Sequence, residues 1–252
     1  MNALIVGTRK ETVLAFLPDT FLLIDDGDLI DAVPPRPRRA VSVFDPAIHS
    51  FNPLRGMDHR RARDFAAAVY STFPQGEGTL TVRNGRRELA KLVLAAPRLD
   101  KVTGDRKDPA VAEALAAIDD ILFSPIVRQV LCNPPNFPVK GIILARLNRA
   151  ELGDHDCYIL GNLLMSLYKG PIVVPDFGFY SASWHSSLLR QNRLVVGINA
   201  FEEAEQLRNQ LLLIDHKVGS HCTAEDAKTL ALYAGYMPDT DGSSMFIRNC
   251  MK

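Results

Sequence analysis

The sequence lacks the features that mark several large classes of protein. Its 29 basic and 29 acidic side chains give a formal net charge of zero over 252 residues, which argues against a protein that coats nucleic acid by bulk electrostatics. No uncharged apolar stretch reaches the ~18–20 residues that span a bilayer. Arg9, Lys10 and Glu11 interrupt the apolar N-terminus, so the residue order of a signal peptide is also missing. We therefore expect a soluble protein, cytoplasmic or, if its source is viral, associated with the virion.

Cysteine is scarce and follows no metal-binding pattern. The four cysteines are separated by 25, 65 and 28 residues and form no CxxC pair, so we expect reduced thiols and no zinc motif. Possible metal ligands do gather in two segments, at residues 153–156, which hold two aspartates and a histidine, and at residues 216–222, which hold His216, His221 and Cys222. We interpret both segments as polar loops. The alternative is a metal-dependent hydrolase whose ligands come from Asp154, His155, Asp176 or His216.

Short apolar runs alternate with segments of helical periodicity. Most of these runs do not alternate apolar with polar residues, which is typical of strands that helices cover on both faces. The predicted strands span 3–6, 21–24, 40–44, 141–145, 171–175 and 194–198, and the predicted helices span 58–73, 85–96, 109–122, 155–169, 201–213 and 223–234. We therefore predict one three-layer α/β domain over residues 1–252, with a mostly parallel sheet and a small helical insertion at 57–138.

The neutral total hides an uneven distribution of charge. Residues 58–107 hold 11 Lys or Arg against 6 Asp or Glu, and residues 201–241 hold 3 against 8. Each segment can be a solvated helical face. Alternatively, the basic segment faces DNA or an acidic neighbouring subunit.

Five phrases occur in a fixed order along the chain. They are a strand, glycine turn and helix start at 3–12, a strand ending in acids at 22–27, Asp45-Pro46 followed by Asn52-Pro53-Leu54, an apolar strand ending at Asp176, and a strand at 193–199 that leads to a helix containing Asp226-Ala227. This order, over about residues 1–236, resembles the P-loop ATPases of the FtsK/HerA and conjugative coupling-protein group. The resemblance implies a P-loop NTPase-like fold of the RecA/FtsK type.

The resemblance also implies roles for particular residues. Those that match the family's nucleotide-binding turn are Gly7, Thr8, Lys10 and Thr12. Asp176 matches the Walker B carboxylate behind Mg²⁺, and Asn199 stands at the position of the sensor glutamine. Arg190 and Arg193 either act in trans in an oligomer or form solvated salt bridges. The ligand that the family implies is ATP with Mg²⁺.

The nucleotide-binding turn departs from the family pattern. An intact P-loop reads GxxxxGK[ST], because successive amides wrap the phosphates and the lysine reaches their oxygens. Here the segment from Gly7 to Thr12 has six residues and no second glycine, and Glu11 follows Lys10. A shorter turn with a carboxylate beside the phosphates should hold a triphosphate poorly.

The Walker B phrase departs as well. Phe177 follows Asp176, where the family has a glutamate that activates water, and no spacing places Glu202 or Glu203 at that position. Aromatic residues in this phrase, among them Phe179, can fill the phosphate site or stack on a base, although core packing is the simpler interpretation.

These departures favour a degenerate protein over an active motor. We predict a non-catalytic or weakly nucleotide-binding component of DNA packaging, transfer or translocation machinery, of viral or mobile-element origin. It would act as a homo-oligomer or within a larger assembly, and would contact DNA, if at all, through residues 58–107. An active, atypical ATPase motor is the main alternative to this prediction, and the metal-dependent hydrolase is the other.

Overall fold

The chain divides into two compact units. The computed structural model describes residues 2–7, 10–27, 29–35, 40–73, 79–214, 216–219, 221–234 and 245–248, and for residues 10, 234 and 245–248 it describes the backbone only. Unit 1 comprises residues 1–41, 141–144 and 170–252, and unit 2 comprises residues 42–140 and 145–169. The expected insertion at 57–138 falls within unit 2, while the single-domain boundary at 1–252 stays a prediction.

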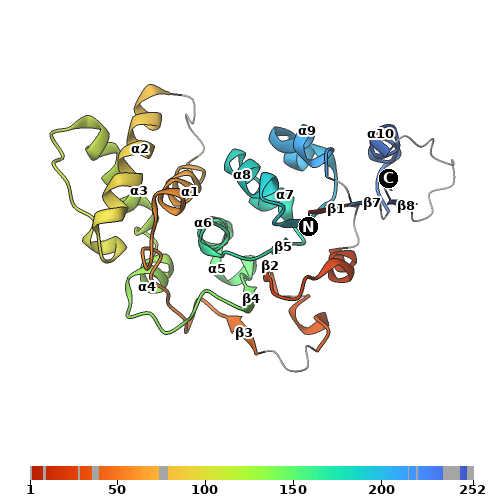
Figure 1. Ribbon diagram of the computed structural model, residues 1–252. Coiled ribbons are helices and arrows are strands. Elements are labelled where there is room, and N and C mark those ends of the chain that lie inside the picture. The colour runs from red at the N-terminus through yellow and green to blue at the C-terminus, as the bar shows by residue number, and fades with distance from the viewer. Residues whose placement is uncertain are drawn as a thin grey trace. The chain divides into compact units, whose positions relative to one another are not determined.

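A mostly parallel sheet, whose strands other than β3 lie wholly or mainly in unit 1, forms the framework of that unit (Figure 1). The strand order is β3-β4-β2-β5-β6-β1-β7-β8. The strands are β1 (Ala3–Val6), β2 (Leu22–Asp25), β3 (Val41–Phe44), β4 (Ile142–Arg146), β5 (Ile172–Val174), β6 (Leu194–Ile198), β7 (His216–Gly219) and β8 (Met245–Arg248). The pairs β2–β5, β5–β6, β6–β1 and β1–β7 are parallel, and β7–β8 is antiparallel. The predicted mostly parallel sheet is confirmed.

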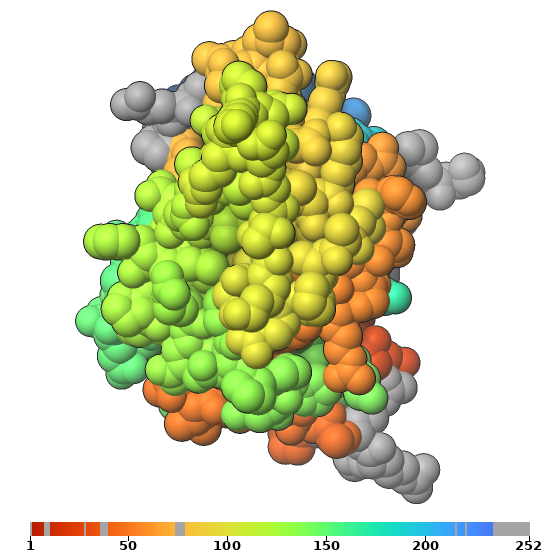
Figure 2. All heavy atoms as spheres, turned by 90° about the vertical axis from the view of Figure 1, so that its left-hand side faces the viewer, coloured from red at the N-terminus to blue at the C-terminus, as the bar shows by residue number. Residues whose placement is uncertain are grey.

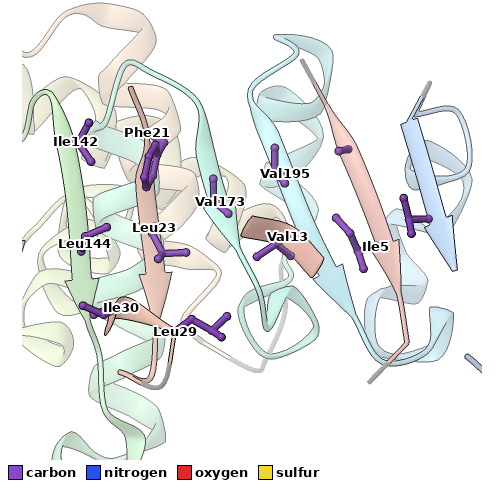
Figure 3. Packing of buried hydrophobic residues seen from close by; sticks show 12 residues of the cluster. Ile5, Val13, Phe21, Leu23, Leu29, Ile30, Ile142, Leu144, Val173 and Val195 are labelled. Carbon is purple, nitrogen blue, oxygen red and sulfur yellow. The ribbon is translucent and has the colours of Figure 1, made fainter. Parts of the chain in front are cut away.

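The inner strands are short and apolar because both of their faces are covered. One face carries a cluster of buried aliphatic and aromatic side chains, packed beneath the 3₁₀ helices η1 (Lys10–Phe16) and η2 (Ile30–Ala32) (Figure 3). Val13 of η1 and Ile30 of η2 belong to this cluster together with Ile5, Leu23 and Val195 of the sheet. Burial of such side chains stabilises the fold by about 1.5–3 kcal/mol each.

Short helices cover the opposite face of the sheet in unit 1 (Figure 1). They are α7 (Phe177–Tyr180), η4 (Ser183–His185), α8 (Ser186–Arg190), η5 (Phe201–Leu207), α9 (Arg208–Leu211) and, beside β7, α10 (Ala224–Ala234). The three layers of helix, sheet and helix are those that the sequence predicts.

Unit 2 is mainly helical. Its helices are α1 (His59–Tyr70), α2 (Leu80–Ala95), η3 (Leu99–Lys101), α3 (Pro109–Ile121), α4 (Pro125–Cys132), α5 (Arg149–Leu152) and α6 (Asp154–Leu167). Asp58 begins α1 by accepting hydrogen bonds from the amides of Arg60 and Arg61, a standard helix N-cap. Figure 2 faces α2 and α3, which pack against each other on this side of unit 2.

Several predicted elements differ from those observed. The predicted helix at 201–213 is wrong as a continuous α-helix, since η5 is kinked at Ala204 and α9 follows it. Strand β7 and helix α4 are not among the predicted elements. Helix α2 begins five residues before its predicted start at Gly85, with Thr79 as N-cap. Among the described helices, none has the length and apolar character needed to cross a membrane.

Candidate functional site

The candidate site lies where the parallel strands of unit 1 end. Val6 of β1 pairs with Ile198 of β6, and Val174 of β5 pairs with Val196 of β6. Residues that follow these strands therefore meet at the carboxyl edge of the sheet, where ligands bind in open α/β folds. Gly7, Asp176 and Asn199 each come within two residues of a strand end.

The turn after β1 differs from an intact phosphate-binding loop. Gly7 has a φ of +124°, which requires glycine, and its amide donates a hydrogen bond to the carbonyl of Ile198 at 2.8 Å. This amide is therefore already engaged within the sheet. The predicted helix start is a seven-residue 3₁₀ helix, η1, whose tighter geometry is poorer for hydrogen bonding than an α-helix. Thr8 lies outside the described residues, as does the side chain of Lys10.

Thr12 and Glu11 lie within η1. Thr12 is half-buried, and Glu11 is exposed. The structure thus keeps a carboxylate in the first turn of η1, in the segment where the family pattern has the phosphate-binding lysine. A negative charge there opposes a bound phosphate.

Asp176 follows β5 at the same edge. It is half-buried and precedes α7 as the N-cap residue, with φ −114° and ψ 59°. Phe177 is fully buried, and its ring centroid lies 5.1 Å from that of His185. Phe177 therefore packs in the interior and supplies no group that could activate water. Phe179 is half-buried, with its ring 4.7 Å from that of Tyr180.

His185 is a buried neutral histidine behind Phe177. Burial lowers its pKa to about 3, against the weaker effect of its hydrogen bond with the amide of Ala182. Its Nδ1 accepts that bond at 3.0 Å, and its Nε2 has no partner among the described residues. Trp184 and His185 are both buried in η4, Ser183–His185.

Asn199 follows β6 and is held by a carboxylate that sequence reasoning left unplaced. The backbone amide of Asn199 donates to Oε2 of Glu203 at 2.9 Å, and its Nδ2 donates to Oε1 at 2.8 Å. A Cβ added to Gly178 would lie 2.4 Å from Oε2 of Glu203. Glu203 therefore lies between the end of β6 and the first turn of α7. The residue of α7 that it contacts, Gly178, comes two residues after Asp176. In the sequence, the only indication of this contact is that Asn199 and Glu203 are four residues apart, on either side of a turn.

A buried carboxylate lies at the end of β2 and accepts hydrogen bonds from the loop that follows. Asp25 is buried, and its Oδ2 accepts hydrogen bonds from the amides of Gly27 at 2.9 Å and Leu29 at 2.8 Å. Because β2 pairs with β5, the acidic end of β2 and Asp176 lie at the same edge of the sheet. The edge is thus rich in carboxylates.

Other phrases of the sequence resemblance have local structural roles. Asp226 accepts a hydrogen bond from the amide of Phe201 at 3.3 Å, and its own amide donates to Thr223 Oγ1 at 3.1 Å. The capping-type start of α10 is therefore present, and it joins this helix to η5. In unit 2, Asp45 and Asn52 cap turns by accepting hydrogen bonds from the amides of residues 47 and 54.

Arg190 and Arg193 lie at the opposite edge of the sheet. Arg193 precedes β6, where its Nε donates to the carbonyl of Gly170 at 3.1 Å and its Nη1 to Gln191. Arg190 is exposed and lines an open depression of about 460 Å³, together with Asn2, Leu189, Asn192, Gln210, Leu213 and Ile214. Neither arginine reaches the candidate site of its own chain, and both expected roles, in trans in an oligomer or in solvated salt bridges, stay predictions.

The metal-binding alternative has no assembled ligand set in the part of the chain that the structure describes. No group of three or more His, Cys, Asp or Glu side chains there is arranged to hold a metal ion. Cys132, Cys157 and Cys222 form no disulfide bond among the described residues, and Cys250 lies outside the described residues.

Comparison with known proteins shows the fold. No protein-family model matches the chain, and no curated protein matches it in sequence. Among solved structures, the bacterial conjugative coupling protein TrwB has a TM-score of 0.60 at 13% identity, over 92% of this chain and 72% of that one. VirB4 of Thermoanaerobacter pseudethanolicus has a TM-score of 0.53 at 8% identity, over 94% of this chain and 81% of that one.

TrwB has also been solved with nucleotides. One such structure holds a non-hydrolysable ATP analogue, with a TM-score of 0.52 to this chain at 13% identity, over 90% of this chain and 72% of that one. Another holds ADP and Mg²⁺, with a TM-score of 0.53 at 14% identity, over 92% of this chain and 73% of that one. The chain therefore has the P-loop ATPase fold of these conjugation proteins.

Proposed function

We propose that this protein is a P-loop NTPase-like component of DNA-transfer or translocation machinery that binds nucleotide weakly and does not hydrolyse it. The observation that carries the proposal is the burial of Phe177 directly after Asp176. In phosphoryl transfer to water, a polar residue must orient the attacking water, and a buried phenyl ring cannot do so.

The turn after β1 supports weak binding. A P-loop binds phosphate through free amides at the start of a helix, whereas the Gly7 amide bonds to Ile198 and a 3₁₀ helix follows. Asp176 remains at the edge of the sheet, where it would hold Mg²⁺ with a bound nucleotide. The metal would supply charge neutralisation of the phosphates. The residues thus fit a nucleotide bound through few contacts.

The test is nucleotide turnover by the purified protein, with and without DNA, beside an Asp176→Ala variant. We expect wild type and variant to show the same background release of phosphate. We also expect ADP with Mg²⁺ to bind the wild type in the high-micromolar range or weaker, and the variant more weakly still. DNA-stimulated hydrolysis that Asp176→Ala abolishes would overturn the proposal and favour an active, atypical ATPase.

We further propose that the exposed face of α2 contacts DNA. Arg83, Arg87 and Lys91 recur every four residues on this helix, with Arg86 beside them, and all four are exposed. Of these, Lys91 has an ion pair with Glu88 at 2.7 Å. Side chains that recur every four residues share one face of a helix, so they can meet successive phosphates of a nucleic acid. Figure 2 faces this part of unit 2.

A charge reversal tests the DNA proposal. We expect the double variant Arg83→Glu/Arg87→Glu to bind duplex DNA more weakly and to lower the slope of log K against log salt by about 2, because each lost phosphate contact removes about 0.9. Arg106→Glu is the control, since Arg106 is exposed, lies in the same unit and is paired with Asp119 at 2.8 Å. Equal DNA affinity in all three proteins would refute the assignment of this face.

We propose, from the likeness to coupling proteins, that the protein works as a homo-oligomer or inside a larger assembly, in the cytoplasm or, if viral, in the virion. Arg190 is then the arginine best placed to reach a neighbouring subunit, because it is exposed at an open depression. Light scattering of the wild type and Arg190→Ala tests this. A wild type that stays monomeric at cellular concentrations, with and without nucleotide, would refute it.

A further inference from the structure

We propose that Glu203 is a positioning residue of the candidate nucleotide site, one that makes the site prefer a nucleoside diphosphate to a triphosphate. This inference rests on the proposed function, because it concerns the same site. Its basis is a contact within the chain, the double hydrogen bond between the Glu203 carboxylate and Asn199.

The contact occupies the group that would meet a terminal phosphate. Asn199 is the residue that the sequence resemblance places at the sensor position. It donates from its backbone amide and from Nδ2 to the two carboxylate oxygens of Glu203, at 2.9 and 2.8 Å. Phosphate oxygens accept hydrogen bonds, so they compete with this carboxylate for the same donors. A third phosphate also brings negative charge towards a carboxylate that two donors already hold in place.

The carboxylate is held in position from two sides. The hydroxyl of Ser181, at the end of α7, donates to the backbone carbonyl of Glu203 at 3.1 Å, and Gln206 of η5 donates to the carbonyl of Ser181 at 3.1 Å. Gly178 leaves the space that the side chain occupies, since a Cβ there would lie 2.7 Å from the Cβ of Glu203 and 3.0 Å from its Cδ. Glu203 is thus anchored at both its backbone and its side chain.

The charge is added to an edge that already holds carboxylates. Asp176 and the acidic end of β2 lie at the ends of neighbouring strands. A single Mg²⁺ can neutralise part of this charge for two phosphates. A third phosphate increases the repulsion from these carboxylates. The donors that Asn199 could offer to it are already bonded to Glu203. We therefore expect Glu203 to disfavour a triphosphate relative to a diphosphate in two ways, by its negative charge and by occupying the hydrogen-bond donors of Asn199.

The experiment compares two nucleotides on four proteins. ADP and a non-hydrolysable ATP analogue, each with Mg²⁺, are titrated calorimetrically into the wild type, Glu203→Gln, Gly178→Ala and Glu202→Gln. Glu203→Gln removes the charge and keeps the side-chain length. Gly178→Ala displaces the same carboxylate by steric contact and leaves its charge unchanged. Glu202→Gln is the matched control, because Glu202 is the residue next to Glu203 on η5 and its side chain is also exposed. Circular dichroism verifies that each variant is folded.

We expect the wild type to bind ADP more tightly than the ATP analogue. Glu203→Gln should then raise affinity for the analogue by about tenfold and leave ADP affinity within about twofold, since removal of one nearby like charge has an effect of this order. Gly178→Ala should shift the ratio in the same direction, and Glu202→Gln should not. A ratio unchanged by Glu203→Gln, an equal effect on both nucleotides, or no binding to any folded variant would each overturn the inference.

The two proposals fail in different ways. A ratio of the two affinities that Glu203→Gln leaves unchanged, in a protein that still releases no phosphate, leaves the non-catalytic function standing and removes only the role of Glu203. Turnover that requires Asp176 overturns the non-catalytic function, whatever the ratio of the two affinities.

Discussion

Replacing Gly197 by alanine should destabilise the protein, although residue preferences suggest the opposite. Gly197 lies within β6, and it is not among the described glycines with positive φ. For such a glycine, alanine ordinarily stabilises by about 0.4–1 kcal/mol because it restricts the unfolded chain. The tertiary structure reverses this expectation, because the added methyl would lie 2.4 Å from the carbonyl oxygen of Pro175.

The loss of stability in Gly197→Ala depends on which atoms must move to make room for the added methyl group. The three atoms nearest to a Cβ at Gly197 belong to the backbone of Pro175, with the carbonyl carbon at 3.2 Å and Cα at 3.4 Å. A backbone cannot rotate away as a side chain can, so β5 must shift relative to β6 by about 1 Å or bend. Overpacking of this kind costs about 1–3 kcal/mol. The shift also stretches the hydrogen bonds between the two strands, so we expect a value near the upper end.

Urea denaturation measures the effect. A loss of about 2–3 kcal/mol, at the m-value of about 1–3 kcal/mol/M that is usual in urea, lowers the unfolding midpoint by about 1 M and leaves m unchanged. Gly141→Ala is a useful comparison, because Gly141 has a φ of +80° and no atom within 4 Å of the added Cβ. Its cost of about 1–2 kcal/mol is purely conformational. If Gly197→Ala were as stable as the wild type, the close approach of Pro175 would be refuted.

Three further substitutions test buried or capping groups. His185→Phe should reduce the loss of stability on acidification. His185 stays neutral in the fold down to its folded pKa of about 3, whereas in the unfolded chain it takes up a proton below about pH 6.5. Urea midpoints at pH 7.5 and 5 measure this loss, and an equal loss in wild type and variant contradicts the prediction. Tyr70→Phe should leave the melting temperature unchanged or higher, because this hydroxyl is buried without a partner among the described residues. Asp58→Ala should lower the melting temperature more at pH 7 than at pH 2. Hydrogen bonds from the amides of Arg61 and Arg60 lower the pKa of Asp58 below 3.8, so the stabilisation is fully present above that pH and is lost as the carboxylate becomes protonated in the fold.

Hydrophobic patterning was enough to predict the framework. Strand β6 and the uninterrupted apolar runs of β1 and β5 fall where the sequence placed them, because strands buried on both faces must be apolar throughout. Helices α1 and α3 follow from helical periodicity, and the structure adds an Asp N-cap to each. The resemblance of five phrases to the FtsK/HerA and coupling-protein group implied the P-loop ATPase fold, which the comparison with TrwB supports.

Local preference could not predict the elements that depend on neighbours. Segment 201–213 has helical periodicity, but η5 turns at Ala204. The amide of Phe201 bonds to Asp226 and the carbonyl of Glu203 bonds to Ser181. Those partners lie 25 and 22 residues away in the chain. The segment after Gly7 became a 3₁₀ helix rather than the predicted start of an α-helix.

The sequence alone determined which groups are available at this site. It showed that the segment from Gly7 to Thr12 has six residues, that Phe177 follows Asp176, and that Asn199 follows the apolar run at 194–198. Only the tertiary structure decided how those groups are used. It turned Phe177 into the interior, engaged the Gly7 amide with Ile198, and brought Glu203 against Asn199. The physical reason is that residue types fix chemistry, whereas hydrogen-bond partners and burial are set by contacts between segments that are distant in the chain.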